Sequence, residues 1–148
     1  MPVNRRKVYA YITHRDCVLV FTHPGAPEAG IQVPGGSLEE GEDPEAGALR
    51  EAMEETGRND LQVERFLGRV VRDMTDYGMD EVHDRHFYHL RCTGEPPECW
   101  GHGEFTPSDG SPGPIPFDFF WLHLAADTPD LVADMGQMLP TLLSWLRE

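Results

Sequence analysis

Three glutamates are spaced so that one helix would bring their carboxylates together. At about 100° per residue, Glu51, Glu54 and Glu55 fall within an arc of about 100°, and the opposite face of residues 44–56 is apolar. Clustered carboxylates are the hard oxygen ligands that Mg²⁺ or Mn²⁺ prefers. A solvated acidic face is the alternative interpretation. It is disfavoured because such faces usually mix charges, and only Arg50 flanks this one.

The residues before and within this helix form a longer pattern. Residues 34–36 read Pro-Gly-Gly, where bare backbone can approach a ligand or a metal ion. The stretch resembles the Nudix box, Gly-x5-Glu-x7-Arg-Glu-U-x-Glu-Glu-x-Gly-U with U bulky and apolar, and a chance match is on the order of 10⁻⁵. Its seven fixed positions are filled by Gly36, Glu42, Arg50, Glu51, Glu54, Glu55 and Gly57. The two U positions depart from the pattern, as Ala52 and Arg58, and Leu61 is expected to supply the missing apolar contact.

The resemblance implies a fold and an activity. The fold is α/β, a Nudix-type α/β/α sandwich with a mixed β-sheet between helices, and residues 1–148 would form a single Nudix hydrolase domain. The activity is divalent-metal-dependent hydrolysis of nucleoside diphosphate-linked compounds, such as a nucleoside di- or triphosphate or a related derivative, by attack of water on a phosphoanhydride. Two alternatives stay open: a Nudix-fold nucleotide-binding or sensor module without catalysis, and a diadenosine polyphosphate hydrolase.

The resemblance also implies roles for single residues. The expected ligands of Mg²⁺, or of Mn²⁺, are Glu51, Glu54, Glu55 and the carbonyl of Gly35. Arg50 is expected to orient these carboxylates, and Glu42 to pair with Arg50 across the loop. The acidic helix would repel a negatively charged diphosphate. Metal ions held by these residues would allow the diphosphate to bind there.

The general base for the attacking water has several candidates. A box glutamate is favoured, with Glu51 and Glu54 in the catalytic set. An acid from the distal segment is the alternative implied by the resemblance, and Glu104 is the best candidate there, ahead of Glu98 and Asp109. A solvated loop acid is the competing interpretation of Glu104.

Candidate substrate contacts lie outside the box. Trp100 or Phe105 would stack on a nucleobase, and Tyr77 and Arg85 complete the expected set. Trp100 and Phe105 belong to residues 92–116, a segment rich in glycine and proline that predicts a long functional loop or a disordered one.

Seven histidines raise the question of a zinc site. His83 and His89 would share one face of a strand, while His86 would face the other way. The first two are six residues apart in the sequence, near 20 Å along a strand, which disfavours a shared metal. Substrate contacts or satisfied surface histidines are the expected roles.

Patterns of apolar residues predict the elements that position the box. Strands are expected at residues 8–13, 17–21, 31–33, 62–74, 82–91 and 117–124. A turn is expected at residues 34–36. A helix is expected at 44–56, with Asp43 as its N-cap and Gly57 past its end. A second helix is expected at 130–146, kinked or split by Gly136 and Pro140.

Charge and cysteine content limit the partners. The 148 residues include 26 acidic and 12 basic side chains, a formal charge of −14, which disfavours nucleic-acid binding. A small nucleotide or nucleotide derivative is the expected partner, and the oligomeric state is left open. The three cysteines form no close pair, and no apolar run approaches the length of a membrane span, so a cytoplasmic location without a membrane partner is expected.

Overall fold

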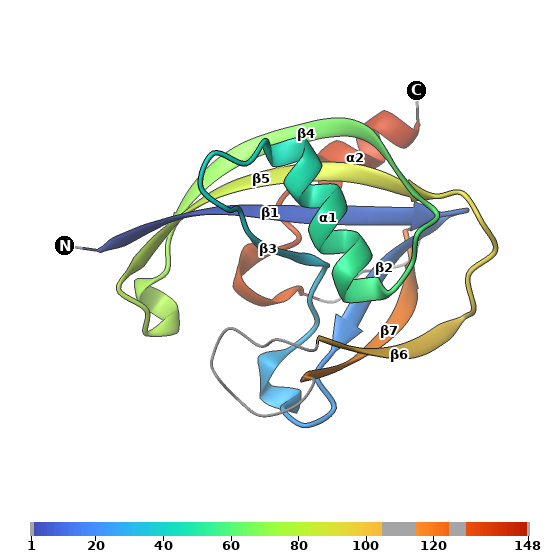
Figure 1. Ribbon diagram of the computed structural model, residues 1–148, viewed down its shortest axis with the longest axis horizontal. Helices are drawn as coiled ribbons and strands as arrows, with labels where there is room; N and C mark the ends of the chain where they lie inside the picture. The colour runs from blue at the N-terminus through green and yellow to red at the C-terminus, as the bar shows by residue number, and fades with distance from the viewer. Residues whose placement is uncertain (1, 105–114, 125–129, 148) are drawn as a thin grey trace.

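Figure 1 shows a twisted sheet with helices on both sides, in a computed structural model that describes residues 2–104, 115–124 and 130–147. Within these residues the sheet has seven strands, ordered β4-β5-β1-β2-β7-β6, with β3 paired to β1. β1 runs parallel to β5, and the other pairs are antiparallel, so the sheet is mixed. The strands are β1 Val3–His14, β2 Cys17–Thr22, β3 Gly35–Ser37, β4 Leu61–Asp73, β5 Glu81–Cys92, β6 Cys99–Glu104 and β7 Ile115–His123.

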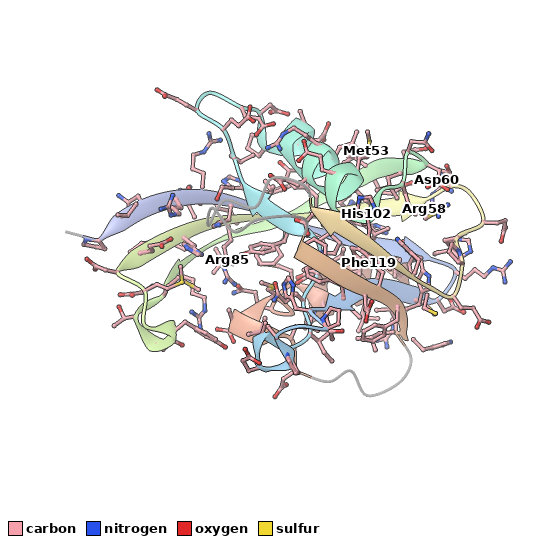
Figure 2. All side chains as sticks on the ribbon, turned by 60° about the horizontal axis from the view of Figure 1, so that its bottom comes forward. Met53, Arg58, Asp60, Arg85, His102 and Phe119 are labelled. Carbon is pink, nitrogen blue, oxygen red and sulfur yellow. The ribbon has the colours of Figure 1, made fainter. Side chains whose placement is uncertain are left out.

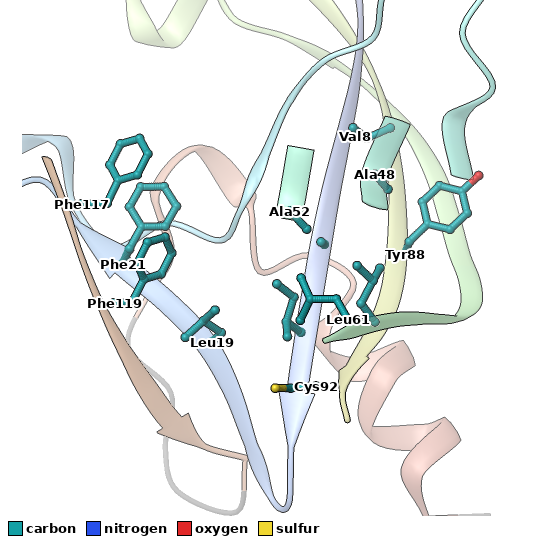
Figure 3. Packing of buried hydrophobic residues seen from close by; sticks show 13 residues of the cluster. Val8, Leu19, Phe21, Ala48, Ala52, Leu61, Tyr88, Cys92, Phe117 and Phe119 are labelled. Atoms are coloured by element: carbon teal, nitrogen blue, oxygen red, sulfur yellow. The ribbon is translucent and has the colours of Figure 1, made fainter. Parts of the chain in front are cut away.

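Helices cover the two faces of the sheet. The helix α1, Pro44–Thr56, buries Ala48 and Ala52 against β1 and β5, as Figure 3 shows. The other face packs against the C-terminal segment, which contains the 3-10 helix η3, Val132–Asp134, and the helix α2, Leu139–Leu146. Two further 3-10 helices, η1 at Pro27–Ala29 and η2 at Thr75–Tyr77, lie in loops. The predicted α/β/α sandwich is confirmed.

The central strand reflects this double cover. Residues 8–13 of β1 are all buried, because alternate side chains meet α1 on one face and the C-terminal segment on the other. Ala52 is fully buried, so a small residue at this box position lets the helix lie close to the sheet. Leu61 joins the same apolar cluster, as expected, while Arg58 forms a two-pronged ion pair with Asp60.

The predicted helix at 44–56 has the bounds of α1. The Asp43 carboxylate caps it by accepting the Ala46 N–H at 3.1 Å, and Gly57 ends it in the left-handed conformation at φ 72°. The predicted second helix is split: α2 begins only at Leu139, with Pro140 in its first turn, where a missing N–H costs no hydrogen bond.

Three expectations about strands and loops were wrong. Residues 35–37, expected as part of a turn, form β3, because β2 pairs with β1 only at residues 13 and 14 and leaves the edge of β1 at residues 7–9 free. The expected strand at 31–33 is reduced to a single bridge between Phe21 and Gln32. The segment 92–116 contains β6, which pairs with β7 over six residue pairs. Within the described ranges, no helix has the length and apolar character that crossing a membrane requires.

Candidate active site

The glycines of β3 allow two box carboxylates to rest on the backbone. A Cβ at position 36 would lie 2.4 Å from the Glu51 carboxylate, so a side chain there would occupy the same space. The N–H of Gly35 donates a hydrogen bond to Glu55 Oε1 at 3.1 Å, and Glu55 is only 6% exposed. Glu51 and Glu55, both from α1, therefore meet the same short stretch of β3.

Pairing with β1 holds that stretch in place. Gly36 lies opposite Val8 in the sheet, and Gly35 lies opposite Tyr9. A Cβ at Gly35 would lie 2.4 Å from the Val8 carbonyl oxygen and 2.6 Å from the Tyr9 ring. Glycine is needed at position 35 for backbone packing and at position 36 for the approach of a carboxylate.

Arg50 connects the helix to the loop before it. Its guanidinium donates to both oxygens of Glu42 at 2.8 Å, in the two-pronged geometry that fixes a carboxylate. A third nitrogen donates to Glu51 at 3.1 Å and to Glu54 at 3.3 Å. Arg50 therefore contacts the predicted brace and two of the predicted metal ligands at once.

Glu42 is a strongly perturbed acid of this network. The hydrogen bonds from Arg50, followed by one from the Glu39 backbone N–H, lower the pKa of Glu42 to about 2. The same pairing raises the pKa of Arg50 above its usual value. The Arg50–Glu42 pair is thus fully charged at neutral pH, which suits a role in fixing the loop rather than in proton transfer.

The donor set fits a divalent cation. Glu51, Glu54 and Glu55 share one helix face, and two of them already lie against the Gly35–Gly36 backbone. Over residues 2–104, 115–124 and 130–147, no three acidic, histidine or cysteine side chains close into a finished metal cage. The Arg50 guanidinium donates to carboxylate oxygens of Glu51 and Glu54, so it holds these two side chains on the same helix face.

A cavity of about 240 Å³ adjoins the box. One end is polar, with Gly35, Gly36, Glu55 and Lys7 in its wall. The other end is lined by Phe21, His23, Gln32 and Phe117. The rings of Phe21, His23 and Phe117 contact one another, with centroids 4.7–5.5 Å apart.

None of the residues at the aromatic end was predicted as a site residue. Phe21 belongs to β2 and Phe117 to β7, and only the antiparallel pairing of these strands brings them together. Lys7 was missed as well, although it is the single lysine of an acidic chain, which was a usable signal.

Trp100 lies at the end of the box helix, not in this cavity. Its indole N–H donates to the Thr56 carbonyl at 3.0 Å, and its ring stacks on Phe119 at 5.2 Å. His102, two residues further along β6, lies against Gly57 at the end of α1. Figure 2 shows His102 beside α1. Because the ring face of Trp100 is already packed, its contacts are those of a support for α1.

Arg85 and Tyr77 lie away from the box. Arg85 is completely buried on the opposite face of the sheet and donates to the Ala133 carbonyl at 2.7 Å (Figure 2). The Tyr77 hydroxyl accepts the Ala133 N–H at 2.8 Å and borders a separate cavity of about 480 Å³, whose wall includes no box residue. The structure does not bring either residue to the glutamates.

The distal acids are only partly described. Glu104 ends β6, where its backbone is paired with Ile115. Phe105 and Asp109 lie outside the described residues. Glu98 precedes β6, in the wall of a cavity with His14 and Trp121.

The three histidines of β5 have separate environments. His83 pairs with Glu81 at 3.0 Å, His86 with Asp84 at 3.5 Å, and His89 shares a hydrogen bond with Thr13 at 2.7 Å. The expected surface position does not hold for His83 and His89, which are buried, and among the described residues the buried Nδ1 of His83 has no hydrogen-bond partner.

A mixed sheet between helical layers, with a glycine strand set against an acidic helix, is the architecture expected of a Nudix hydrolase. The family model described as NUDIX domain matches residues 3–137. The chain therefore belongs to the Nudix family, and with a complete box it is a pyrophosphohydrolase enzyme.

Solved structures share the fold. A MutT NUDIX hydrolase from Burkholderia pseudomallei is 24% identical with a TM-score of 0.66, over 94% of this chain and 98% of that one. An ADP-ribose pyrophosphatase from Streptococcus suis is 20% identical with a TM-score of 0.60, over 97% and 92%. A UDP-X diphosphatase is 18% identical with a TM-score of 0.65, over 99% of this chain but 64% of its own. The comparison with curated proteins gives no match.

Proposed function

We propose that this enzyme hydrolyses a nucleoside diphosphate-linked compound with the help of Mg²⁺ or Mn²⁺. The observation that carries the proposal is the meeting of Glu51 and Glu55 on the Gly35–Gly36 backbone, at the wall of a cavity whose far end is aromatic. A charged diphosphate fits the first end and a flat ring the second. The names of two similar structures, an ADP-ribose pyrophosphatase and a UDP-X diphosphatase, agree with this substrate class.

The metal would be held by Glu51, Glu54, Glu55 and the carbonyl of Gly35. When bound, a divalent cation supplies Lewis-acid stabilisation of the charge that develops on phosphate oxygens. Arg50 keeps two of these carboxylates in place through its bonds to them, while its pair with Glu42 anchors it to the loop. This division of roles follows the hydrogen bonds of Arg50, which all go to oxygen atoms of the box and its loop.

The reaction needs a water, a base and a leaving phosphate. Water attacks one phosphorus, the phosphoanhydride P–O bond breaks, and the leaving phosphate departs with the bridging oxygen. We assign proton removal from the water to the Glu51 carboxylate, because it lies against Gly36, a residue of the cavity wall. Glu104 stays the alternative base, and activity of a Glu51→Gln variant would favour it.

The aromatic end of the cavity is the proposed site for the base. Phe21 and Phe117 line this end with aromatic rings that are themselves almost completely buried. The Gln32 amide donates one hydrogen bond to the Ala29 carbonyl at 3.3 Å, and its type carries a further N–H and an acceptor oxygen. At about 240 Å³ the cavity is smaller than the roughly 300 Å³ at which pockets for whole drug-sized ligands begin. We therefore expect it to take one ring system, with the rest of the substrate outside.

A panel of nucleotides and nucleotide derivatives with Mg²⁺ tests the proposal. Release of phosphate, pyrophosphate or a nucleoside monophosphate identifies the bond that is cut. Glu55→Gln keeps the hydrogen bond from Gly35 but removes a charge, and we expect kcat to fall at least about 100-fold. Glu64→Gln, on the remote strand β4, is the matched control and should be active.

Two results would contradict the proposal. Binding without turnover of any compound would make the protein a nucleotide sensor. Full activity of Glu55→Gln at saturating Mg²⁺ would show that the box does not take part in the reaction.

A cytoplasmic location is part of the same proposal, since all three cysteines are free thiols, as in a reducing compartment.

A further inference from the structure

Lys7 lies in the wall of the cavity beside the box. It lies on β1, opposite Ser37 of β3 and Arg85 of β5. Its side chain shares the cavity wall with Gly36 and Glu55. Among the described residues, the ammonium makes no hydrogen bond and no ion pair, although every arginine of this region does.

The acids that could neutralise Lys7 are engaged elsewhere. Glu81 accepts hydrogen bonds from Arg5 at 2.7 Å and from His83 at 3.0 Å. Glu51 accepts one from Arg50 at 3.1 Å. Both glutamates still act on Lys7 through space, but burial outweighs them and lowers the pKa of Lys7 below its usual value. A half-buried ammonium without a partner is costly, which favours an anion that arrives with the ligand.

Other cations near the box cannot take this role. The Arg50 guanidinium is committed to Glu42 and to the helix carboxylates, and Arg85 is completely buried. Of the described residues that line this cavity, Lys7 is the one lysine, and none is an arginine.

We propose that the Lys7 ammonium binds a non-bridging oxygen of the substrate's diphosphate. Its position at the polar end places the diphosphate between Lys7 and Glu55, with the ring system toward Phe21 and Phe117. Lys7 thus sets the direction in which the substrate enters. The inference rests on the proposed function, because it takes the same cavity as the substrate site.

The test uses imidodiphosphate, a diphosphate that resists hydrolysis, in the presence of Mg²⁺. Titration calorimetry should show binding to the wild-type protein. Lys7→Gln and Lys7→Met should each raise the Kd at least about tenfold, and Lys7→Arg should recover part of the affinity. Arg91→Gln removes the same charge from an exposed pair with Glu64 and should leave the Kd within about twofold of wild type.

A second measurement separates Lys7 from the metal ligands. Mg²⁺ alone should bind Lys7→Gln as tightly as wild type or more tightly, because a repelling charge has been removed. An unchanged Kd for imidodiphosphate in both uncharged variants would overturn the inference, and so would a wild-type protein that does not bind the probe. If the probe behaves as expected but no compound of the panel is hydrolysed, the proposed function fails and the role of Lys7 stands.

Discussion

Replacing Gly36 by alanine should displace the Glu51 carboxylate and leave the fold intact. The new Cβ would lie 2.4 Å from the nearest carboxylate atoms of Glu51. Ordinary contact begins at 3.4 Å, so the carboxylate must retreat by 3.4 − 2.4 = 1.0 Å. Since a misplacement of about 1 Å in a reacting group can cost about 100-fold in rate, we expect kcat to fall by about that factor.

Stability should hardly change in this variant. The atoms that must move are the end of a flexible side chain, so we expect the Tm to stay within about 3 °C of wild type. This corresponds to a change of less than about 1 kcal/mol in the free energy of unfolding. Gly35→Ala should behave differently, because its Cβ would meet the Val8 backbone carbonyl and the Tyr9 ring, which cannot retreat cheaply. That variant should melt at a clearly lower temperature.

Steady-state kinetics with the best nucleotide and saturating Mg²⁺, beside thermal melting, measure both effects. Gly25→Ala is the matched control, since nothing lies within 4 Å of its added Cβ. The reasoning is refuted if folded Gly36→Ala keeps kcat within about threefold of wild type, because the position of the Glu51 carboxylate would then not govern the reaction.

Three further predictions concern the residues around the box. Arg50→Lys should lower kcat more than it raises KM, because lysine cannot hold both oxygens of Glu42 while contacting the helix carboxylates; a rise in KM alone would make Arg50 a substrate contact. The pKa of Glu42 is lowered to about 2 from an ordinary 4.5, so its pair adds stability above about pH 4.5 that is lost as the pH falls toward 2. Melting curves should show wild type and Glu42→Gln differing most at pH 6–7 and converging toward pH 2, and a constant difference would contradict this. Trp100→Phe should lose the hydrogen bond to the Thr56 carbonyl, which lowers the free energy of unfolding by about 1 kcal/mol and the Tm by about 2–4 °C, while KM stays unchanged. A raised KM at an unchanged Tm would show that Trp100 is a substrate contact.

The box helix could be predicted almost to the residue. Its carboxylates, its cap at Asp43 and its end at Gly57 depend on contacts within a few positions of the chain, which spacing alone reveals. Arg50 and Glu42 are likewise close in the sequence, and their pairing was expected. Local periodicity also located most of the strands within a few residues.

The partners of the aromatic residues could not be predicted in the same way. Trp100 was expected to stack on a base, but it supports the end of α1, because β6 pairs with β7 in a segment that has the composition of a loop. Arg85 has the residue type of a phosphate ligand, yet the parallel pairing of β5 with β1 buries it beneath the C-terminal segment.

The sequence by itself determined the acidic helix, the glycines before it and the family. Only the tertiary structure decided what surrounds them. The cavity joins Lys7 of β1 to Phe21 of β2 and Phe117 of β7, residues that are far apart in the chain and meet through strand pairing. Helical spacing repeats within one turn and is visible in a short window, whereas strand neighbours are chosen by burial across the whole sheet.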